Sequence, residues 1–299
     1  MQIALKVDVD TLRGTLDGVP ALLRLFEQHH VRATFLFSLG PDHTGRALRR
    51  VFRPGFLSKV RRTSVASHYG LKTLMYGTLL PGPHIGHRAG HIMREVAAAG
   101  HEVGIHCYDH IRWQDFVAKK NADWTRREMQ RAVDAFQEVF GREADVIGAA
   151  GWQINSHALA LEEEFGFSYA SDVRGESAFY PLLEAVSSDC LQIPTTLPTL
   201  DELIGLDEIT DANVHEAVFE ASRRVLPNGH VYTLHAELEG MALLPVMQQL
   251  LANWQAAGDS LGTLRDSWTS LDQTAVPTRQ IVWDEVPGRS GLLAVQGTT

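Results

Sequence analysis

Short apolar runs alternate with longer segments over most of this chain. The apolar runs are rich in Val, Ile, Leu and Phe and end at polar residues, a pattern typical of buried strands. We predict strands at Ile3–Val9, Ala33–Ser38, Glu102–His106, Val146–Ala149, Phe167–Ser171, Cys190–Ile193 and Val231–His235, and a further one around Asp259–Leu264.

The segments between these runs are predicted helices. They lie at Val19–His29, Gly86–Ala99, Arg126–Phe140, Ser156–Phe165, Asn213–Val225 and Met241–Ala257. A glycine, which is the expected helix stop, directly follows several of them: Gly100, Gly141, Gly166 and Gly258. Strands that alternate with helices predict a parallel α/β fold, and about seven such units predict a βα barrel.

The length of 299 residues suits one βα-barrel domain. We place this domain in residues 1–270. The tail, residues 271–299, contains Pro277, Pro287 and several glycines, so we expect an irregular C-terminal extension. The two cysteines give no disulfide framework, and we interpret Cys107 as a buried packing residue.

Charge is distributed unevenly along the chain. The formal net charge is −9, yet residues 43–94 contain no Asp or Glu and hold ten of the 27 basic residues. Apolar residues such as Phe52, Leu57 and Leu74 lie among these bases. Because basic amphipathic segments bind anionic lipid surfaces, we interpret residues 43–94 as a membrane-facing insert after the second strand. An ordinary packed helical insert with a basic surface is the alternative.

Two other kinds of partner are disfavoured. The sequence shows no nucleic-acid recognition module, and the chain outside residues 43–94 is strongly acidic, so we expect no nucleic acid. No apolar run approaches the ~18 residues of a transmembrane helix, and no signal peptide precedes the first strand. We therefore expect a protein that touches a membrane from one side, with no stable protein partner.

Polar residues that suit a catalytic site follow three of the predicted strands. Asp8 and Asp10 lie two positions apart on the first strand and so face the same way; such a pair suggests a bound cation or a shared proton. His106 and His110, four apart on one helical turn, would share a face and could bind a metal ion. His235 ends a third strand. Each has an ordinary structural alternative, but active sites of α/β folds lie at these carboxyl ends.

The order Asp-x-Asp, His-x3-His and Leu-His resembles the polysaccharide deacetylase family, also called the NodB-homology or fourth carbohydrate esterase family. One branch, which deformylates a formamido-sugar carried on undecaprenyl phosphate, resembles this chain beyond these motifs. The resembling stretches span most of the chain: Val7–Thr11, Arg13–Thr15, Gly18–Pro20, Phe37–Asp42, Glu102–His106, Ala149–Trp152, Ser171–Asp172, Arg174–Gly175, Ile193–Pro194, Leu197–Thr199, Thr233–Glu237 and Glu239–Gly240.

The resemblance implies a distorted (β/α)7 barrel and a metal-dependent amide hydrolase. Asp8 would be the general base and His235 the general acid, while Asp10, His106 and His110 would bind one divalent metal ion. Two imidazoles and one carboxylate suit Zn, Co, Ni or Mn. The substrate would be the lipid-linked sugar, reached at the cytoplasmic face of the bacterial inner membrane by a peripheral enzyme of lipid A modification and polymyxin resistance.

The third motif departs from the family pattern. Many relatives carry an arginine there that orients the base, whereas this chain has Ala149–Trp152. We hypothesise that Arg174 supplies the missing positive charge. Asp172 could pair with Arg174 or with His235, or could cap a helix.

Further residues are candidates for binding or supporting the substrate. Trp152 could form a wall of the sugar pocket or pack in the core. Glu237 could bind the sugar or its amine, or form a salt bridge at the strand end. Arg13 lies in a resembling stretch close to the two aspartates.

Two alternatives to a deformylase remain. One is an N-deacetylase of another glycan, such as chitin oligosaccharide or peptidoglycan, which the lack of an export signal disfavours. The other is a catalytically idle relative that binds a glycolipid. The presence of a base, three ligands and an acid disfavours this second alternative.

Overall fold

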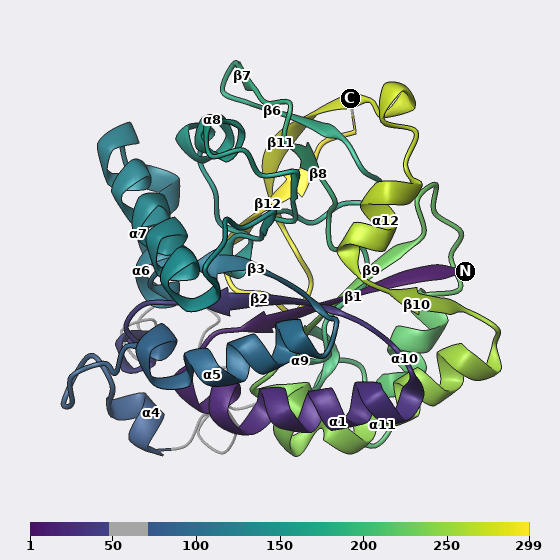
Figure 1. The fold of residues 1–299 in the computed structure, drawn as a ribbon. Helices are drawn as coiled ribbons and strands as arrows, with labels where there is room; N and C mark the ends of the chain where they lie inside the picture. The colour runs from purple at the N-terminus through teal and green to yellow at the C-terminus, as the bar shows by residue number, and fades with distance from the viewer. Residues whose placement is uncertain (48–70, 299) are drawn as a thin grey trace.

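The computed structural model describes residues 1–47 and 71–298, which form two sheets surrounded by helices (Figure 1). In this part of the chain the larger sheet has eight strands, in the order β10-β1-β2-β3-β4-β5-β8 with β9 also paired to β1. The strands are β1 (Gln2–Val9), β2 (Thr34–Ser38), β3 (Glu102–Cys107), β4 (Val146–Ile147), β5 (Tyr169–Ala170), β8 (Leu191–Gln192), β9 (His230–His235) and β10 (Ser260–Gly262).

Strand β1 pairs with three other strands of this sheet. Its residues 3–8 pair with β9, its residues 6–9 pair with β2, and its residues 2–4 pair with β10, all in parallel. The chain after β8 comes back to β9, where the amides of Thr196 and Leu197 both donate hydrogen bonds to the carbonyl of Val231. The sheet therefore curls into a distorted β/α barrel, which confirms the predicted fold.

The two faces of β1 have different neighbours because side chains alternate along a strand. Ile3, Leu5 and Val7 join the large apolar cluster that the strands form with the helices. Ala4 joins a smaller cluster with side chains from β2, β4, β5, β8 and β9, which is the interior of the barrel. The even-numbered positions of β1 therefore point into the barrel.

Helices cover the outer face of the barrel, and Figure 1 shows α1, α5 and α11 side by side against it. The α-helices of the described residues are α1 (Val19–His29), α4 (Leu71–Met75), α5 (Ile85–Ala98), α6 (His110–Phe116), α7 (Ala122–Phe140), α8 (Ser156–Glu164), α9 (Leu200–Leu203), α10 (Val214–Ala221), α11 (Leu244–Ala256) and α12 (Leu264–Ser270). Helix α7 begins earlier than predicted because the side chain of Asn121 accepts a hydrogen bond from the amide of Trp124. Helix α11 begins later than predicted because Met241 has a non-helical conformation.

The expectation of an irregular C-terminal extension is wrong. The last two strands form a hairpin that joins an earlier hairpin in a four-stranded sheet: β6 (Tyr180–Leu183), β7 (Val186–Ser187), β11 (Thr278–Glu285) and β12 (Leu292–Gln296). Pro277 and Pro287 lie outside these strands, and Gly288 and Gly291 adopt positive φ in the connection between them. These residues bracket the strands rather than interrupt them.

The predicted basic insert lies partly outside the described residues. Residues 48–70, which include most of the basic residues of this insert, lie outside the described residues. The end of the interval is helix α5, whose buried residues Ile85, Ala89 and Met93 belong to the main core. That part of residues 43–94 is therefore barrel rather than insert. In the part of the chain that is described, no helix is both long and apolar enough to cross a bilayer.

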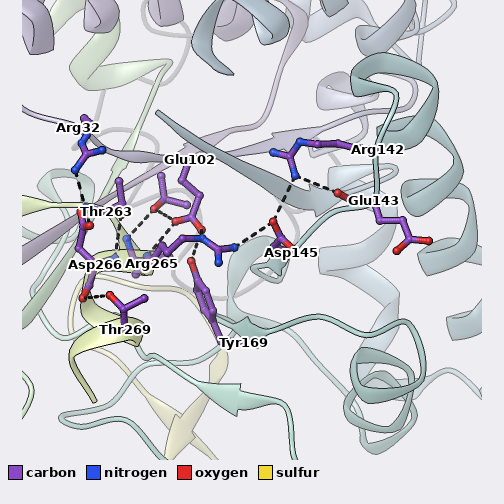
Figure 2. A network of polar contacts seen from close by, with 12 residues as sticks. Arg32, Glu102, Arg142, Glu143, Asp145, Tyr169, Thr263, Arg265, Asp266 and Thr269 are labelled. Carbon is purple, nitrogen blue, oxygen red and sulfur yellow. Dashed lines mark hydrogen bonds and ion pairs between the residues drawn. The ribbon is translucent and has the colours of Figure 1, made fainter. Parts of the chain in front are cut away.

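A polar network occupies the end of the barrel where the strands begin (Figure 2). Glu102, the first residue of β3, accepts hydrogen bonds from Tyr169 Oη at 2.5 Å, Thr34 Oγ1 at 2.6 Å and Arg265 Nε at 3.1 Å. Arg265 also pairs with Asp145 at 3.1 Å. The charges of Glu102 and Arg265 at this end are thus matched within the chain.

His101, just before β3, makes the stability of the fold depend on pH. Its Nδ1 accepts a hydrogen bond from the amide of Ala33, and burial lowers its pKa to about 4. The unfolded chain therefore takes up a proton below its ordinary pKa of 6.5 while the folded chain does not, so stability is lost as pH falls from 6.5 towards 4.

We expect His101→Asn, whose amide oxygen can still accept from Ala33, to remove part of this pH dependence. Because the ring is partly screened by solvent, the difference between pH 7.5 and pH 5 should shrink by about 1 kcal/mol, or about 2 °C in Tm. Thermal unfolding at both pH values measures it, with exposed His91→Asn as control. Equal pH dependence in His101→Asn and the wild type would contradict this assignment.

Candidate active site

Asp10, His106 and His110 come together at the carboxyl ends of β1 and β3. His106 Nε2 lies 3.3 Å from Asp10 Oδ1, and His110 Nε2 lies 3.4 Å from Asp10 Oδ2. One ligand atom from each residue lies within 4.8 Å of the other two. The three side chains that the sequence predicts as metal ligands are thus close enough to bind one ion.

The two histidines reach this place differently from our prediction. His106 and His110 do not share a helical turn, because His106 is in strand β3 and His110 is the first residue of α6. The pairing of β2 with β3 shifts register between Ile105 and Cys107, and such a bulge redirects the residue at which it occurs. The side chain of Asp109 caps α6 by accepting a hydrogen bond from the amide of Arg112.

The ring of His106 is fixed by a hydrogen bond on its far side. Its Nδ1 lies 2.7 Å from the carbonyl oxygen of Gly148, which follows β4. Because a carbonyl can only accept, Nδ1 donates the proton, and Nε2 keeps its lone pair towards Asp10. This is the tautomer and the outer hydrogen bond that metal-binding histidines usually have.

Asp8 and His235, the predicted base and acid, lie on adjacent strands. They are direct partners in the pairing of β1 with β9. Asp8 is 3% exposed, and its Oδ1 lies 3.9 Å from His106 Nδ1. The backbone of His235 is held by Glu239, which accepts a hydrogen bond from its amide at 2.9 Å. The structure thus brings both residues to the level of the metal-binding group.

Several buried polar atoms of this region have no hydrogen-bond partner among the described residues. They are Asp8 Oδ1, Asp10 Oδ1, His235 Nδ1 and Glu237 Oε2. A buried polar atom without a partner costs about 1–3 kcal/mol, so a cluster of them marks a place where a ligand completes the bonding. Carboxylate oxygens and imidazole nitrogens are donors to a divalent ion, so the residues present fit a metal.

The charges in this region also suit a cation. Burial alone would raise the pKa of Asp10, but the nearby imidazoles of His110, His106 and His235 together hold that pKa below its ordinary value. Burial alone would lower the pKa of His106, but the carboxylates of Asp8 and Asp10 raise it. The site therefore favours the ionised form of Asp10 and attracts positive charge beside it.

Glu237 supports the loop after β1. Its Oε1 accepts hydrogen bonds from Thr11 N and Thr11 Oγ1, both at 2.8 Å, and from Asp10 N at 3.1 Å. A Cβ atom on Gly14 would lie 2.0 Å from the same oxygen, so this close approach requires glycine. Arg13, in the same loop, lies 3.6 Å from Asp17 with a partly exposed side chain. Glu237 thus fixes the segment that carries Asp10.

The hypothesis that Arg174 supplies the charge next to Asp8 is wrong. Its guanidinium donates to Glu202 Oε1 at 2.6 Å and to the carbonyl of Leu197 at 3.0 Å. Nor does Asp172 pair with Arg174, because Asp172 accepts hydrogen bonds from Ala149 N and Gln192 Nε2, both at 2.6 Å. The side chain of Arg174 turns towards α9 because its acidic partner lies there.

Trp152 packs in the core. It is 3% exposed, and its Nε1 donates to Thr195 Oγ1 at 3.2 Å. The guanidinium of Arg174 lies 5.1 Å from the centre of its ring. Of its two predicted roles, these contacts favour packing.

Lys6 is a residue of this region that our sequence analysis missed. Its Nζ lies 3.7 Å from Asp8 Oδ2 and donates a hydrogen bond to the carbonyl of Ser171 at 2.8 Å. The period of two that places Asp8 and Asp10 on one face of β1 places Lys6 on it as well. The sequence signal was therefore present, and only the expectation that lysines lie at the surface obscured it.

The chain belongs to the polysaccharide deacetylase family, whose model matches residues 3–170. It is thus a member of a metal-dependent family of hydrolases that act on amide bonds, and it carries a three-residue group that fits a metal ion.

Two curated relatives are similar over almost their whole length. The "Probable 4-deoxy-4-formamido-L-arabinose-phosphoundecaprenol deformylase" of Shewanella sediminis is 37% identical, over 99% of this chain and 95% of the relative. The protein of the same name from Wigglesworthia glossinidia brevipalpis is 32% identical, over 95% of this chain and 98% of the relative.

Solved structures show the same fold. A structure from Mycobacterium smegmatis matches with a TM-score of 0.64 at 19% identity, covering 95% of this chain and 94% of that one. A "probable Polysaccharide deacetylase" from Pseudomonas aeruginosa matches with a TM-score of 0.57 at 14% identity, covering 89% of each chain.

We expect His110→Ala to weaken metal binding by at least about 100-fold, because it removes one of three ligands. Metal content after dialysis against a graded series of chelator concentrations, read by mass spectrometry, measures the change. The matched control is exposed His91→Ala, which should bind metal as the wild type does. Equal metal retention in the two variants would contradict the assignment of His110 as a ligand.

Proposed function

We propose that this protein deformylates 4-deoxy-4-formamido-L-arabinose linked to undecaprenyl phosphate, giving the 4-amino sugar and formate. The observation that carries the proposal is the convergence of Asp8, Asp10, His106, His110 and His235 in a chain whose relatives bear the name of that reaction. The amino sugar would serve lipid A modification, which lowers negative charge on the outer membrane and gives resistance to polymyxin.

Asp10, His106 and His110 would hold the divalent metal, which when bound supplies a Lewis acid and lowers the pKa of water. Zn, Co, Ni and Mn all suit this ligand set.

Asp8 would take a proton from the attacking water as the water oxygen bonds to the formyl carbon. Asp8 is almost fully buried and its Oδ1 accepts no hydrogen bond from the described residues, which supports this role. His235 would give a proton to the sugar nitrogen as the carbon–nitrogen bond breaks. The products are formate and the free amine, so all atoms of the water and of the formamide are accounted for.

A polyprenyl-linked substrate also requires contact with a bilayer. Leu16, Leu79 and Phe116 are large apolar side chains that are 41%, 79% and 49% exposed. Each lies in a segment that follows β1, β2 or β3 in the chain, and the carboxyl ends of β1 and β3 carry the metal-binding group. Exposed Lys119 and Lys120 follow Phe116 three and four positions later in the sequence. We infer that this end rests on the anionic cytoplasmic face of the inner membrane.

We expect wild-type, metal-loaded protein to release formate from the undecaprenyl-phosphate-linked formamido-sugar and no acetate from the acetamido analogue. Asp8→Asn should lower kcat by about 100-fold or more, because it removes the base and keeps the shape. Exposed Asp134→Asn, with the same chemical change, should keep the wild-type rate. Acetate release, or silence on both substrates despite bound metal, would contradict the deformylase proposal.

We expect the protein to float with vesicles that contain phosphatidylglycerol and not with pure phosphatidylcholine, and to be released by salt. The double variant Leu79→Glu/Phe116→Glu should lose most of this binding, because it places charges where apolar side chains meet the lipid. Val225→Glu changes another exposed apolar residue, away from these strand ends, and serves as control. Equal flotation of the double variant and the control would disprove the proposed orientation.

A further inference from the structure

Lys6 carries its charge in the interior of the barrel. Its side chain is completely buried on the inner face of β1. Burial lowers the pKa of Lys6, and the carboxylates of Asp8 and Asp172 oppose that shift. Removing an ammonium ion from water is so costly that a well-packed apolar side chain of similar volume is often the more stable choice. Stability of the barrel therefore gives little reason for a lysine here.

The surroundings of Lys6 fix the position of its ammonium group. Its Nζ donates to the carbonyl of Ser171 at 2.8 Å and lies 5.8 Å from the ring centre of Trp152. Contacts with Ser171, directly after β5, and with Trp152, after β4, thus hold the ammonium group in a position that faces Asp8.

The two oxygens of the Asp8 carboxylate have different neighbours. Oδ2 faces Lys6 Nζ at 3.7 Å, a distance that makes an ion pair rather than a hydrogen bond. Oδ1 faces the ring of His106 at 3.9 Å and accepts no hydrogen bond from the described residues. The ion pair therefore constrains one oxygen and leaves the other available to a ligand.

Arg174 does not provide this contact, because its guanidinium is committed to Glu202. The ring of His106 also lies close to Asp8, but its Nδ1–H is donated to the carbonyl of Gly148. Lys6 is thus the cation that can set the direction of the Asp8 carboxylate.

We propose that Lys6 is a positioning residue for the reaction: its ammonium ion holds Asp8 Oδ2, so that Oδ1 points at the site where the proton of water is taken. The proposal rests on the proposed function of Asp8 as general base. Lys6 would act through Asp8, because the contacts of its ammonium group are with Asp8, Ser171 and Trp152. A lysine that served only to join β1 to β5 would instead affect folding and not the chemical step.

The kinetic test compares Lys6→Met, which keeps the length of the side chain and removes the charge, with Lys6→Arg, which keeps the charge. In the metal-loaded protein, Lys6→Met should lower kcat for formate release by about 100-fold, with KM within about threefold of the wild type and metal content unchanged. Lys6→Arg should recover at least about tenfold of that loss. Exposed Arg127→Met on α7, a residue outside the site and the proposed membrane surface, controls for loss of a positive side chain elsewhere.

Three kinetic results would overturn the proposal. One is a kcat of Lys6→Met within about threefold of the wild type. Another is a change confined to KM, which would indicate a role in binding. The third is a folded, metal-loaded Lys6→Arg protein that is as slow as Lys6→Met.

A second readout needs no activity, so it separates failure of this proposal from failure of the proposed function. The Tm of metal-loaded Lys6→Met, Asp8→Asn and the double variant form a double-mutant cycle. Each single change leaves one buried charge unpaired and should lower Tm, whereas the double variant should recover more than half of the summed loss. Additive changes would disprove the ion pair, even if no formate is released. If Lys6→Met does not fold, two measurements still test the proposal. They are the Tm of the double variant and the kcat of Lys6→Arg.

Discussion

The constraint on which this structure depends is the burial of charge on the inner face of β1. Lys6, Asp8 and Asp10 point into a barrel interior that also holds a cluster of apolar side chains. Charges in such a place are tolerated only when other groups come within a few ångströms of them. Those groups come from the ends of β3, β4, β5 and β9, so the curl of the sheet and the chemistry of the site require each other.

Two groups of buried charges lie close to the ring of Trp152. Lys6 lies 5.8 Å from its ring centre, while Arg174 and Arg289 lie at 5.1 and 4.7 Å. The two arginines are matched by Glu202. Burial alone would raise the pKa of Glu202, but the charges of Arg289 and Arg174 hold that pKa below its ordinary value. This second group ties α9 to the C-terminal hairpin, so it stabilises the fold, whereas the Lys6 group borders the metal-binding residues.

Much of the site could be read from the sequence because it rests on short-range alternation. A period of two placed Asp8 and Asp10 on one face, and apolar runs located the strands that carry His106 and His235. The predictions that were wrong depend on contacts between residues that are far apart in the sequence. The bulge at His106 arises from pairing with β2. The partner of Arg174 is Glu202, which lies on α9, further along the chain. The hairpin at the C-terminus exists because β11 pairs with remote β6.

The polar groups at the two ends of the barrel differ in whether they have hydrogen-bond partners, and this difference indicates which end carries the active site. At the amino ends of the strands, Glu102 is matched by Tyr169, Thr34 and Arg265. At the carboxyl ends, oxygens of Asp8 and Asp10 have no hydrogen-bond partner among the described residues. The first arrangement stabilises the fold, while the second lowers stability and persists only because a ligand can complete it. Segments at this second end also expose apolar side chains, as a site that receives a lipid-linked headgroup would need.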